Sequence, residues 1–241
     1  MDRVIYLAMA GAKATMQRQD VLAHNLANAS TTGFRAEMMA FRSVPVLGDG
    51  ASTRVYAIES TPGYNADPGP VAATGRNLDV AMKGQAWLAV QGRDGTEAYT
   101  RNGALDVDSQ GLLITRSGQA VLGDGGPITV PANAQVLIGA DGTVTATVAG
   151  GKPQGIGRLK LVTPEAPLLR GEDGLFRGGD GDLQADATAR VQDGALEGSN
   201  VSPVESMVAM IAAARQFEQQ MKMLSTSQER EQSATKLLAS S

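Results

Sequence analysis

The sequence predicts an α+β protein in which helices at the two ends of the chain pair as a coiled coil, with a β-rich middle domain of short antiparallel strands between them in sequence. Two observations lead to this prediction. Glycine is concentrated in the middle, since 27 of the 29 glycines lie between Gly48 and Gly198 and the last 43 residues contain none. Near both ends, apolar residues recur at alternating spacings of three and four, as in helices that pack along a heptad seam.

The N-terminal segment predicts a helix that runs to about Ala29 and then ends abruptly. Its heptad positions are Ile5, Met9, Ala12, Met16, Gln19, Ala23 and Leu26. From Asn28 to Gly33 follows a cluster of residues that compete for backbone hydrogen bonds or tolerate a positive φ, which favours a helix end and a turn. The single histidine, His24, is expected to be a helix-surface or packing residue.

The middle of the chain divides into two parts. Residues 36–76 are rich in Gly, Pro, Ser and Thr and are predicted to form an extended linker region. Residues 77–199 are predicted to form the β-rich outer domain, with Trp87 in its core. Its strand candidates are 85–91, 98–101, 105–107, 112–115 and 135–138, with 159–162 and 189–191 as later additions. Asp-Gly and Asn-Gly dipeptides separate the strands, which is typical of meandering antiparallel sheets.

The C-terminal segment predicts a second, longer helix that reaches about Ala239. Ser202 and Glu205 form a capping box, and Pro203 stands at the first helical position, where its missing amide costs nothing. The heptad seam is Met207, Met210, Ala214, Phe217, Met221, Leu224 and Gln228, and Ile211 widens it. Packing the first helix on the last buries both seams, so residues 1–35 and 200–241 are expected to form one helical domain.

Composition argues against several classes of function. A net charge of −4 without a basic run, and 4% aromatic residues, provide no surface for nucleic acid. The chain contains no cysteine and only one histidine, which argues against disulfide frameworks, zinc sites and thiol catalysis. No apolar run approaches the ~20 residues of a membrane-spanning helix, and the N-terminus lacks the pattern of a cleaved secretory signal. We therefore expect no enzymatic activity, catalytic residues, cofactor, metal ion or small-molecule substrate.

Three segments resemble the signature motifs of the flagellar axial proteins, the family of rod, hook and filament-junction subunits. Asn25-Leu-Ala-Asn28 followed by Ser30-Thr-Thr-Gly33-Phe34 is similar to the N-terminal signature. Residues 84–115 resemble the β-domain motif of rod and hook proteins, and residues 196–208, which run into 215–218, resemble the C-terminal signature. The opening residues 1–13 and the Ala-Ser-Thr-Thr-Gly-Phe-Arg turn are most similar to proximal rod subunits, with distal rod subunits as the second choice.

The resemblance implies a structural subunit of the proximal rod in the flagellar basal body. In this family the terminal helices form the inner tube of the rod, which transmits torque and encloses the export channel. The implied partners are further copies of the chain, other proximal rod subunits, the distal rod protein and the flagellar type III export apparatus. The implied location is the basal body in the periplasmic space, reached without a cleaved signal peptide.

Two groups of residues are expected to carry this role. The assembly interface is expected to be buried only when subunits polymerise, and it comprises Ile5, Met9, Met16, Leu26, Met207, Met210, Ile211, Phe217, Met221 and Leu224. The helix-end motif, which releases the chain from the first helix toward the middle domain, comprises Asn25, Asn28, Thr32, Gly33 and Phe34. Ser202, Pro203 and Glu205 are expected to cap the C-terminal helix.

Two alternatives remain open at this point. A secreted, adhesin-like β-domain on a coiled-coil stalk would show the same two helical seams, but it would not localise to basal bodies. An enzyme is the third reading, and it would bind a ligand or metal in the β-domain.

Overall fold

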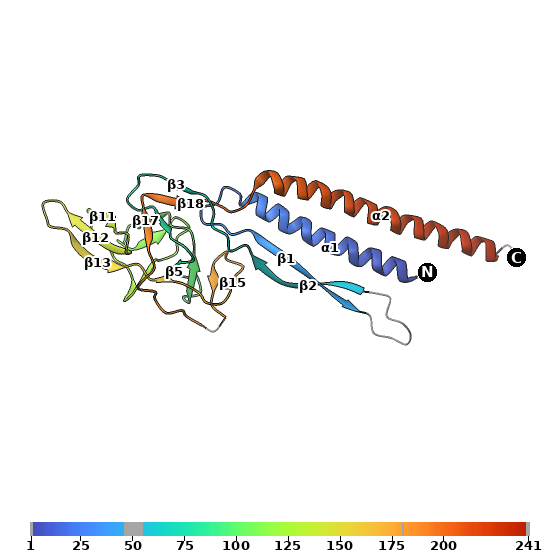
Figure 1. Cartoon of the computed structure of the whole chain (residues 1–241), viewed down its shortest axis with the longest axis horizontal. Coiled ribbons are helices and arrows are strands. Elements are labelled where there is room, and N and C mark those ends of the chain that lie inside the picture. Colours follow the sequence, from blue (N-terminus) through green and yellow to red (C-terminus); the bar gives the residue numbers. More distant parts are fainter. Residues whose placement is uncertain (1, 46–54, 180, 240–241) are drawn as a thin grey trace. The chain divides into compact units, whose positions relative to one another are not determined.

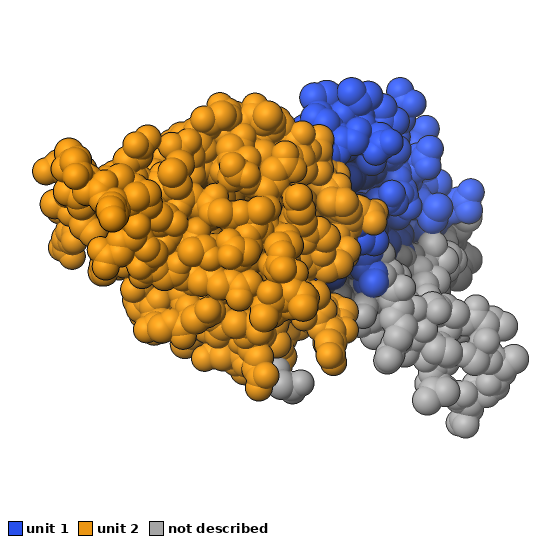
Figure 2. Space-filling view, turned by 60° about the vertical axis from the view of Figure 1, so that its left-hand side comes forward, with its two compact units in different colours: residues 1–29, 36–65, 201–241 blue, residues 30–35, 66–200 orange. Residues whose placement is uncertain are grey.

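The computed structural model describes residues 2–45, 55–179 and 181–239 and divides the chain into two compact units. Unit 1 comprises residues 1–29, 36–65 and 201–241, and unit 2 comprises residues 30–35 and 66–200. Figure 2 colours the residues of the two units. Unit 1 contains both helices and one β-hairpin, whereas unit 2 is built of β-strands. The predicted α+β class, with terminal helices that pair and a middle of short antiparallel strands, is confirmed.

Unit 1 is organised by two long helices, α1 (Asp2–Ala27) and α2 (Pro203–Ala239). They lie side by side and run in opposite directions (Figure 1). Helix α1 ends two residues before the predicted Ala29, and the turn that follows is made of the Asn, Ser, Thr and Gly residues that the sequence singles out. Helix α2 ends at the predicted Ala239.

A β-hairpin completes unit 1 in the segment for which the sequence predicted extended structure. Strands β1 (Glu37–Pro45) and β2 (Val55–Tyr64) pair antiparallel, with Glu37 opposite Tyr64 and a register irregularity between Met38 and Ala40. Both strands contact α1. The chain between the two strands, residues 46–54, lies outside the described residues. The extended backbone of this segment therefore forms hydrogen-bonded strands rather than running singly.

Unit 2 contains two sheets of three or more strands and four two-stranded ribbons among its described residues. The five-stranded sheet has the order β14-β5-β6-β16-β15 and the three-stranded sheet the order β11-β12-β13. Their bounds are β5 (Trp87–Gln91), β6 (Glu97–Thr100), β14 (Leu161–Val162), β15 (Leu169–Arg170), β16 (Phe176–Arg177), β11 (Ala134–Ile138), β12 (Thr143–Val148) and β13 (Gln154–Arg158). The ribbons are β3 (Val71–Ala73) with β18 (Ala195–Glu197), β4 (Val80–Met82) with β17 (Val191–Asp193), β7 (Leu105–Val107) with β8 (Leu113–Thr115), and β9 (Leu122–Gly123) with β10 (Gly126–Pro127).

The core of unit 2 lies between these sheets and ribbons. Leu105, Leu113 and Val144 are fully buried at alternating positions of β7, β8 and β12, and Leu88 is buried in β5, where four successive residues are covered. All four belong to one hydrophobic cluster. Trp87 is buried, as predicted, and packs on Phe176 with ring centroids 4.7 Å apart. The predicted strand segments coincide with observed strands to within two residues. The strands that the sequence did not predict in unit 2 are β3, β4, β9, β10, β12, β13, β15, β16 and β18.

Candidate functional site

The contact between α1 and α2 is formed by small and polar side chains. Ala8, Ala12 and Thr15 are buried on α1, and Ser206 and Ala213 are buried on α2. We call these five residues the contact seam. Gly11 stands beside it, and an added Cβ at this position would lie 2.8 Å from Nε2 of Gln220. Small residues allow two helices to approach closely, and large side chains are left for other faces.

One polar contact crosses the contact seam. The Thr15 hydroxyl donates to the carbonyl of Gly11 at 2.9 Å and lies 3.2 Å from Oε1 of Gln220. Gln220 is spaced seven residues from Ala213, which in turn is seven residues from Ser206. Ala12 is buried at its predicted seam position, whereas the other buried positions lie one residue before Met9, Met16, Met207 and Ala214.

The residues predicted for the assembly interface take two kinds of position. Leu26, Met210, Phe217 and Leu224 are half-buried beside the contact seam. Met9, Met16, Met207, Ile211 and Met221 are 45–56% exposed. The side chain of Ile5 lies outside the described part of the chain. Burial of these residues on assembly stays a prediction.

The first turns of α2 carry a contiguous apolar surface, which we call the outer stripe. Val204, Met207, Val208 and Ile211 follow the i, i+3, i+4, i+7 spacing that places four side chains on one helical face. Their exposed fractions are 70%, 51%, 62% and 56%. Ser206 and Ala213 lie on the opposite side of the helix at 100° per residue, so the outer stripe faces away from α1. Isolated exposed apolar residues are ordinary, whereas a continuous stripe on one face indicates an interaction site.

One half of the predicted capping box is present at the start of α2. The Glu205 amide donates to Oγ of Ser202 at 3.4 Å, and the Ser206 amide donates to the Ser202 carbonyl at 3.0 Å. Pro203 is the first residue of the helix. The cap fixes the start of α2, and Val204, the first residue of the outer stripe, is the second residue of this helix.

The end of α1 is joined to the hairpin of unit 1 by the first half of the helix-end motif. Asn25 is buried and makes two bonds with the backbone of Glu37: its Nδ2 donates to the carbonyl at 2.9 Å, and its Oδ1 accepts from the amide at 2.8 Å. His24 Nδ1 lies 3.0 Å from Oε2 of Glu37. Asn28 Nδ2 donates to the His24 carbonyl at 2.9 Å, which satisfies one of the free carbonyls at the helix end. These contacts fix the first residue of β1 on α1.

The second half of the helix-end motif belongs to unit 2. Gly33 has a φ of +69°, and its amide donates to the Glu197 carbonyl at 2.8 Å. Phe34 is buried, and the guanidinium carbon of Arg170 lies 4.6 Å from its ring centroid. Thr32, which directly precedes Gly33 in the sequence, is half-buried. The turn is therefore part of the β-rich unit rather than a free connection.

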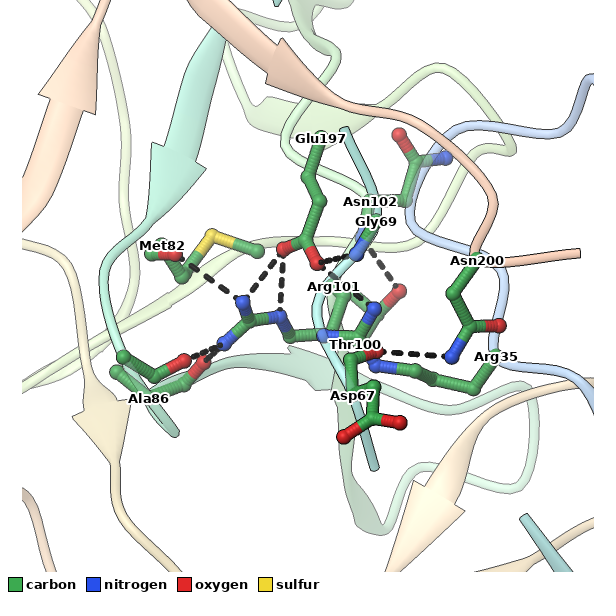
Figure 3. A network of polar contacts seen from close by, with 11 residues as sticks. Arg35, Asp67, Gly69, Met82, Ala86, Thr100, Arg101, Asn102, Glu197 and Asn200 are labelled. Atoms are coloured by element: carbon green, nitrogen blue, oxygen red, sulfur yellow. Dashed lines mark hydrogen bonds and ion pairs between the residues drawn. The ribbon is translucent and has the colours of Figure 1, made fainter. Parts of the chain in front are cut away.

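Behind this turn lies a buried group of charges that centres on Glu197 (Figure 3). Arg35 and Arg101 are 2% exposed and Glu197 is 1% exposed. Nη1 of Arg35 lies 2.7 Å from Oε1 of Glu197. Arg101 donates to Oε2 from Nε at 2.8 Å, and its Nη2 lies 2.5 Å from the same oxygen. The Gly69 amide donates to Oε1 at 2.9 Å. We call these contacts the Glu197 network.

Arg101 also bonds to the end of strand β4 and to the turn between β4 and β5. Its Nη1 donates to the carbonyls of Gly84, at 3.0 Å, and of Ala86, and its Nη2 donates to the carbonyl of Met82 at 3.2 Å. Burial lowers the pKa of Arg101, the Glu197 carboxylate raises it, and the nearby Arg35 lowers it. A guanidinium titrates so far above neutrality that Arg101 remains charged at pH 7.

The Glu197 network joins the three segments that resemble family motifs, and the sequence reasoning did not identify it. Arg35 directly follows the N-terminal motif, Arg101 lies within the central motif, and Glu197 lies within the C-terminal motif. No local signal distinguished these three residues, because the central motif also contains charged residues that are exposed, such as Arg93 and Asp94, and the C-terminal motif also contains the exposed Glu205. Charged residues are rarely buried unless they are paired.

Potential metal ligands do not gather at one place among the described residues. No group of three or more His, Cys, Asp or Glu side chains in the part that the structure describes is arranged to hold a metal ion. Neither of the described helices combines the length and apolar character required to cross a bilayer.

Comparison with known families matches most of the chain to flagellar proteins. The family described as "Flagella basal body rod protein" matches residues 5–35, "Flagellar hook protein FlgE/F/G D1 domain" matches residues 81–146, and "Flagellar basal body rod FlgEFG protein C-terminal" matches residues 192–237. These three regions contain Arg35, Arg101 and Glu197 respectively.

Curated relatives match over the whole length. The flagellar basal-body rod protein FlgF of Salmonella typhimurium strain LT2 is 48% identical, and that of Escherichia coli K12 is 47% identical, each over 252 residues that cover 100% of both chains. The flagellar basal-body rod protein FlgG of Bacillus subtilis strain 168 is 31% identical over 95% of this chain and 96% of its own. The chain is thus more similar to these FlgF proteins than to this FlgG protein.

Proposed function

Since the chain belongs to the flagellar basal-body rod protein family and is a structural subunit of the rod, we propose that it polymerises through its two paired helices, with the outer stripe of α2 seated on neighbouring subunits. The exposure of this stripe is the observation that supports the proposal. Four large apolar side chains on one face are unfavourable in water, and burying each of them contributes roughly 1.5–3 kcal/mol.

The composition of the contact seam supports the same proposal. Alanine, serine and threonine form the contact within the chain, so large apolar residues of both helices stay available for other subunits. Met9 and Met16 are exposed on α1, as are Met207 and Met221 on α2. Methionine adapts to irregular neighbours because its side chain is unbranched and flexible. A coiled coil that continues from the pair within one chain into a tube of many chains would use both sets of residues.

The finer aspects of the proposal rest on the similarity to the FlgF proteins. We propose a place in the proximal part of the rod, where the tube of helices transmits torque and encloses the export channel. The partners are then other rod subunits, including the distal rod protein, and the flagellar type III export apparatus. The location is the basal body in the periplasmic space, and the role is non-enzymatic and needs no cofactor.

The test of the polymerisation surface is Ile211→Asp. A carboxylate in the outer stripe would have to be buried without a partner on assembly, so we expect the variant to be absent from isolated basal bodies and the cells to be non-motile. Because Ile211 faces away from α1, the monomer should keep its helical content by circular dichroism. Phe217→Asp is less informative, because Phe217 lies beside the contact seam and its change would also disturb the pairing of α1 with α2.

Gln216→Asp is the matched control, since Gln216 is exposed on α2 but lies outside the outer stripe. We expect this variant to enter basal bodies and to support motility. Normal incorporation of Ile211→Asp would contradict the proposal, and so would equal exclusion of both variants, because exclusion would then not depend on the stripe.

A further inference from the structure

The polypeptide chain crosses between unit 1 and unit 2 at four places in the sequence. The chain passes from one unit to the other after residues 29, 35, 65 and 200. Any load that passes along the backbone between the helices and the β-rich unit therefore enters unit 2 through residues 30–35, 66–70 or 196–200. How these three connecting segments are held within unit 2 decides how it takes up such a load.

The connecting segments are bonded to one another by their backbones. The amide of Gly33 donates to the carbonyl of Glu197 at 2.8 Å, and the amide of Gly198 donates to the carbonyl of Pro70 at 2.8 Å. Nδ2 of Asn200 donates to the carbonyl of Asp67 at 2.8 Å. Each segment thus contacts at least one of the other two.

Close packing at one point shows how little space separates the segments. A Cβ added to Gly69 would lie 2.2 Å from the carbonyl oxygen of Gly198. Cβ atoms do not approach oxygen to this distance, so only glycine fits at this crossing. The backbones of segments 66–70 and 196–200 are therefore in direct contact.

The Glu197 carboxylate bonds all three segments to the body of unit 2 at the same time. Its Oε1 contacts Arg35, from segment 30–35, and the Gly69 amide, from segment 66–70. Its Oε2 contacts Arg101, whose guanidinium donates to three carbonyls between Met82 and Ala86. Glu197 itself belongs to the third segment and to strand β18.

We propose that Glu197 is a load-sharing clamp: its carboxylate fixes the three connecting segments to each other and to the strands of unit 2, so that force on one segment is carried by all of them. This inference concerns unit 2 alone and does not depend on the proposed polymerisation surface.

The chemistry of the Glu197 network is better suited to holding segments in fixed positions than to raising the free energy of unfolding. Replacing a buried ion pair by apolar residues of similar volume is often neutral or stabilising, so three buried charges are a poor choice for stability alone. A carboxylate, however, has about four acceptor positions and binds several donors in fixed directions, which apolar packing does not do. At Glu197 the Arg101 guanidinium and the Gly69 amide use this capacity as directed donors, and the Arg35 guanidinium adds an ion pair.

The two arginines contribute differently, and this difference provides a variant that should fold. Arg101 makes directed hydrogen bonds to Glu197 and to three carbonyls. Arg35 approaches Glu197 as an ion pair, and its Nε and Nη1 atoms make no hydrogen bond to the described residues. Arg35→Met therefore releases segment 30–35 from the clamp and leaves the contacts of Glu197 with Arg101 and Gly69 in place.

The experiment is residue-resolved amide hydrogen exchange on the purified full-length chain. In Arg35→Met we expect the Gly33 amide, which bonds to the Glu197 carbonyl, to exchange at least about tenfold faster, as loss of a charge-assisted contact implies. The Ala89 amide, which bonds to the carbonyl of Lys160 within the strands of unit 2, should keep its rate. Arg116→Met, at an exposed arginine of unit 2, is the matched control and should change neither rate.

A second variant tests the carboxylate itself. Glu197→Gln keeps the shape but removes the charge that holds both guanidinium groups, so Gly33 and Gly198 should both exchange faster while Ala89 remains protected. An unchanged Gly33 rate in Arg35→Met would overturn the proposal. A uniform increase at Gly33, Gly198 and Ala89 in both variants would also overturn it, since the network would then support the whole fold rather than clamp its connections.

Discussion

At the scale of single residues, Gly33 occupies a backbone position where two separate effects exclude any side chain. Its φ of +69° lies in the left-handed region, and a Cβ would lie 2.3 Å from the carbonyl carbon of Arg101 and 2.4 Å from the amide nitrogen of Asn102. Gly75 has nearly the same φ, +70°, but a Cβ there would meet nothing within 4 Å. A side chain at Gly75 would therefore cause backbone strain alone, whereas a side chain at Gly33 would cause both strain and steric collision.

We predict that Gly33→Ala is much more destabilising than Gly75→Ala. The strain of a left-handed alanine costs about 1–2 kcal/mol, which is the full effect expected at Gly75. At Gly33 the collision with backbone atoms adds a further ~1–3 kcal/mol, because neither residue 101 nor 102 can move without disturbing the Glu197 network. Urea unfolding of the two variants measures the difference in free energy of unfolding. Equal losses would mean that the turn shifts freely to accept a side chain.

The same scale shows why the buried charges escaped sequence reasoning. The Gly33 turn could be predicted, since a Ser-Thr-Thr-Gly run after a helix specifies a turn by its local chemistry. Arg35 and Glu197 are 162 positions apart in the sequence, and Arg101 and Glu197 are 96 positions apart. Local patterns carry no information about contacts over such distances. In one sequence without aligned relatives, a buried arginine looks the same as an exposed one.

At the scale of secondary-structure elements, the two helices show how a correct periodicity can still point to a neighbouring face. The heptad spacing predicted both helices and their pairing, which the structure confirms. The sequence reasoning placed larger residues, such as Met9 and Met207, on the heptad seams. The structure buries the neighbouring smaller residues Ala8 and Ser206 in the contact between the helices, and it leaves Met9 and Met207 exposed. The hairpin of β1 and β2 was missed because its composition resembles that of an irregular linker.

We predict that Ala213→Leu disrupts the pairing of α1 with α2, whereas Ala212→Leu does not. Ala213 is 2% exposed in the contact seam, so three added carbons would force the helices apart at a cost of about 1–3 kcal/mol. Ala212 is exposed on the same helix, and leucine has nearly the same helix propensity as alanine. Thermal unfolding of unit 1, followed by circular dichroism at 222 nm as a helix signal, compares the two variants. A larger loss of thermal stability in Ala212→Leu than in Ala213→Leu would show that α1 packs on a different face of α2.

At the scale of the whole molecule, the division of labour between the two units follows from where apolar residues are buried. Unit 2 buries its own core, in which residues such as Leu88 and Leu105 are fully covered within one chain. The helices of unit 1 leave the outer stripe and several methionines exposed. A chain that completes one core and leaves a second apolar surface open is suited to folding its β-rich unit alone and to completing its helical part by assembly.

Methionine oxidation provides a test of this division on the unmodified protein. Met207, in the outer stripe, is 51% exposed, and Met82, in the core of unit 2, is 3% exposed. In the purified monomer, hydrogen peroxide should oxidise Met207 at least about tenfold faster than Met82, because reactivity follows access to the sulfur. In isolated basal bodies the Met207 rate should fall toward that of Met82, since assembly buries the outer stripe, while the Met82 rate stays the same and serves as the internal control. Mass spectrometry of peptides from both samples gives the rates. If Met207 reacts equally fast in monomer and basal bodies, the outer stripe stays in solvent after assembly, and neighbouring subunits must contact another face of the helices.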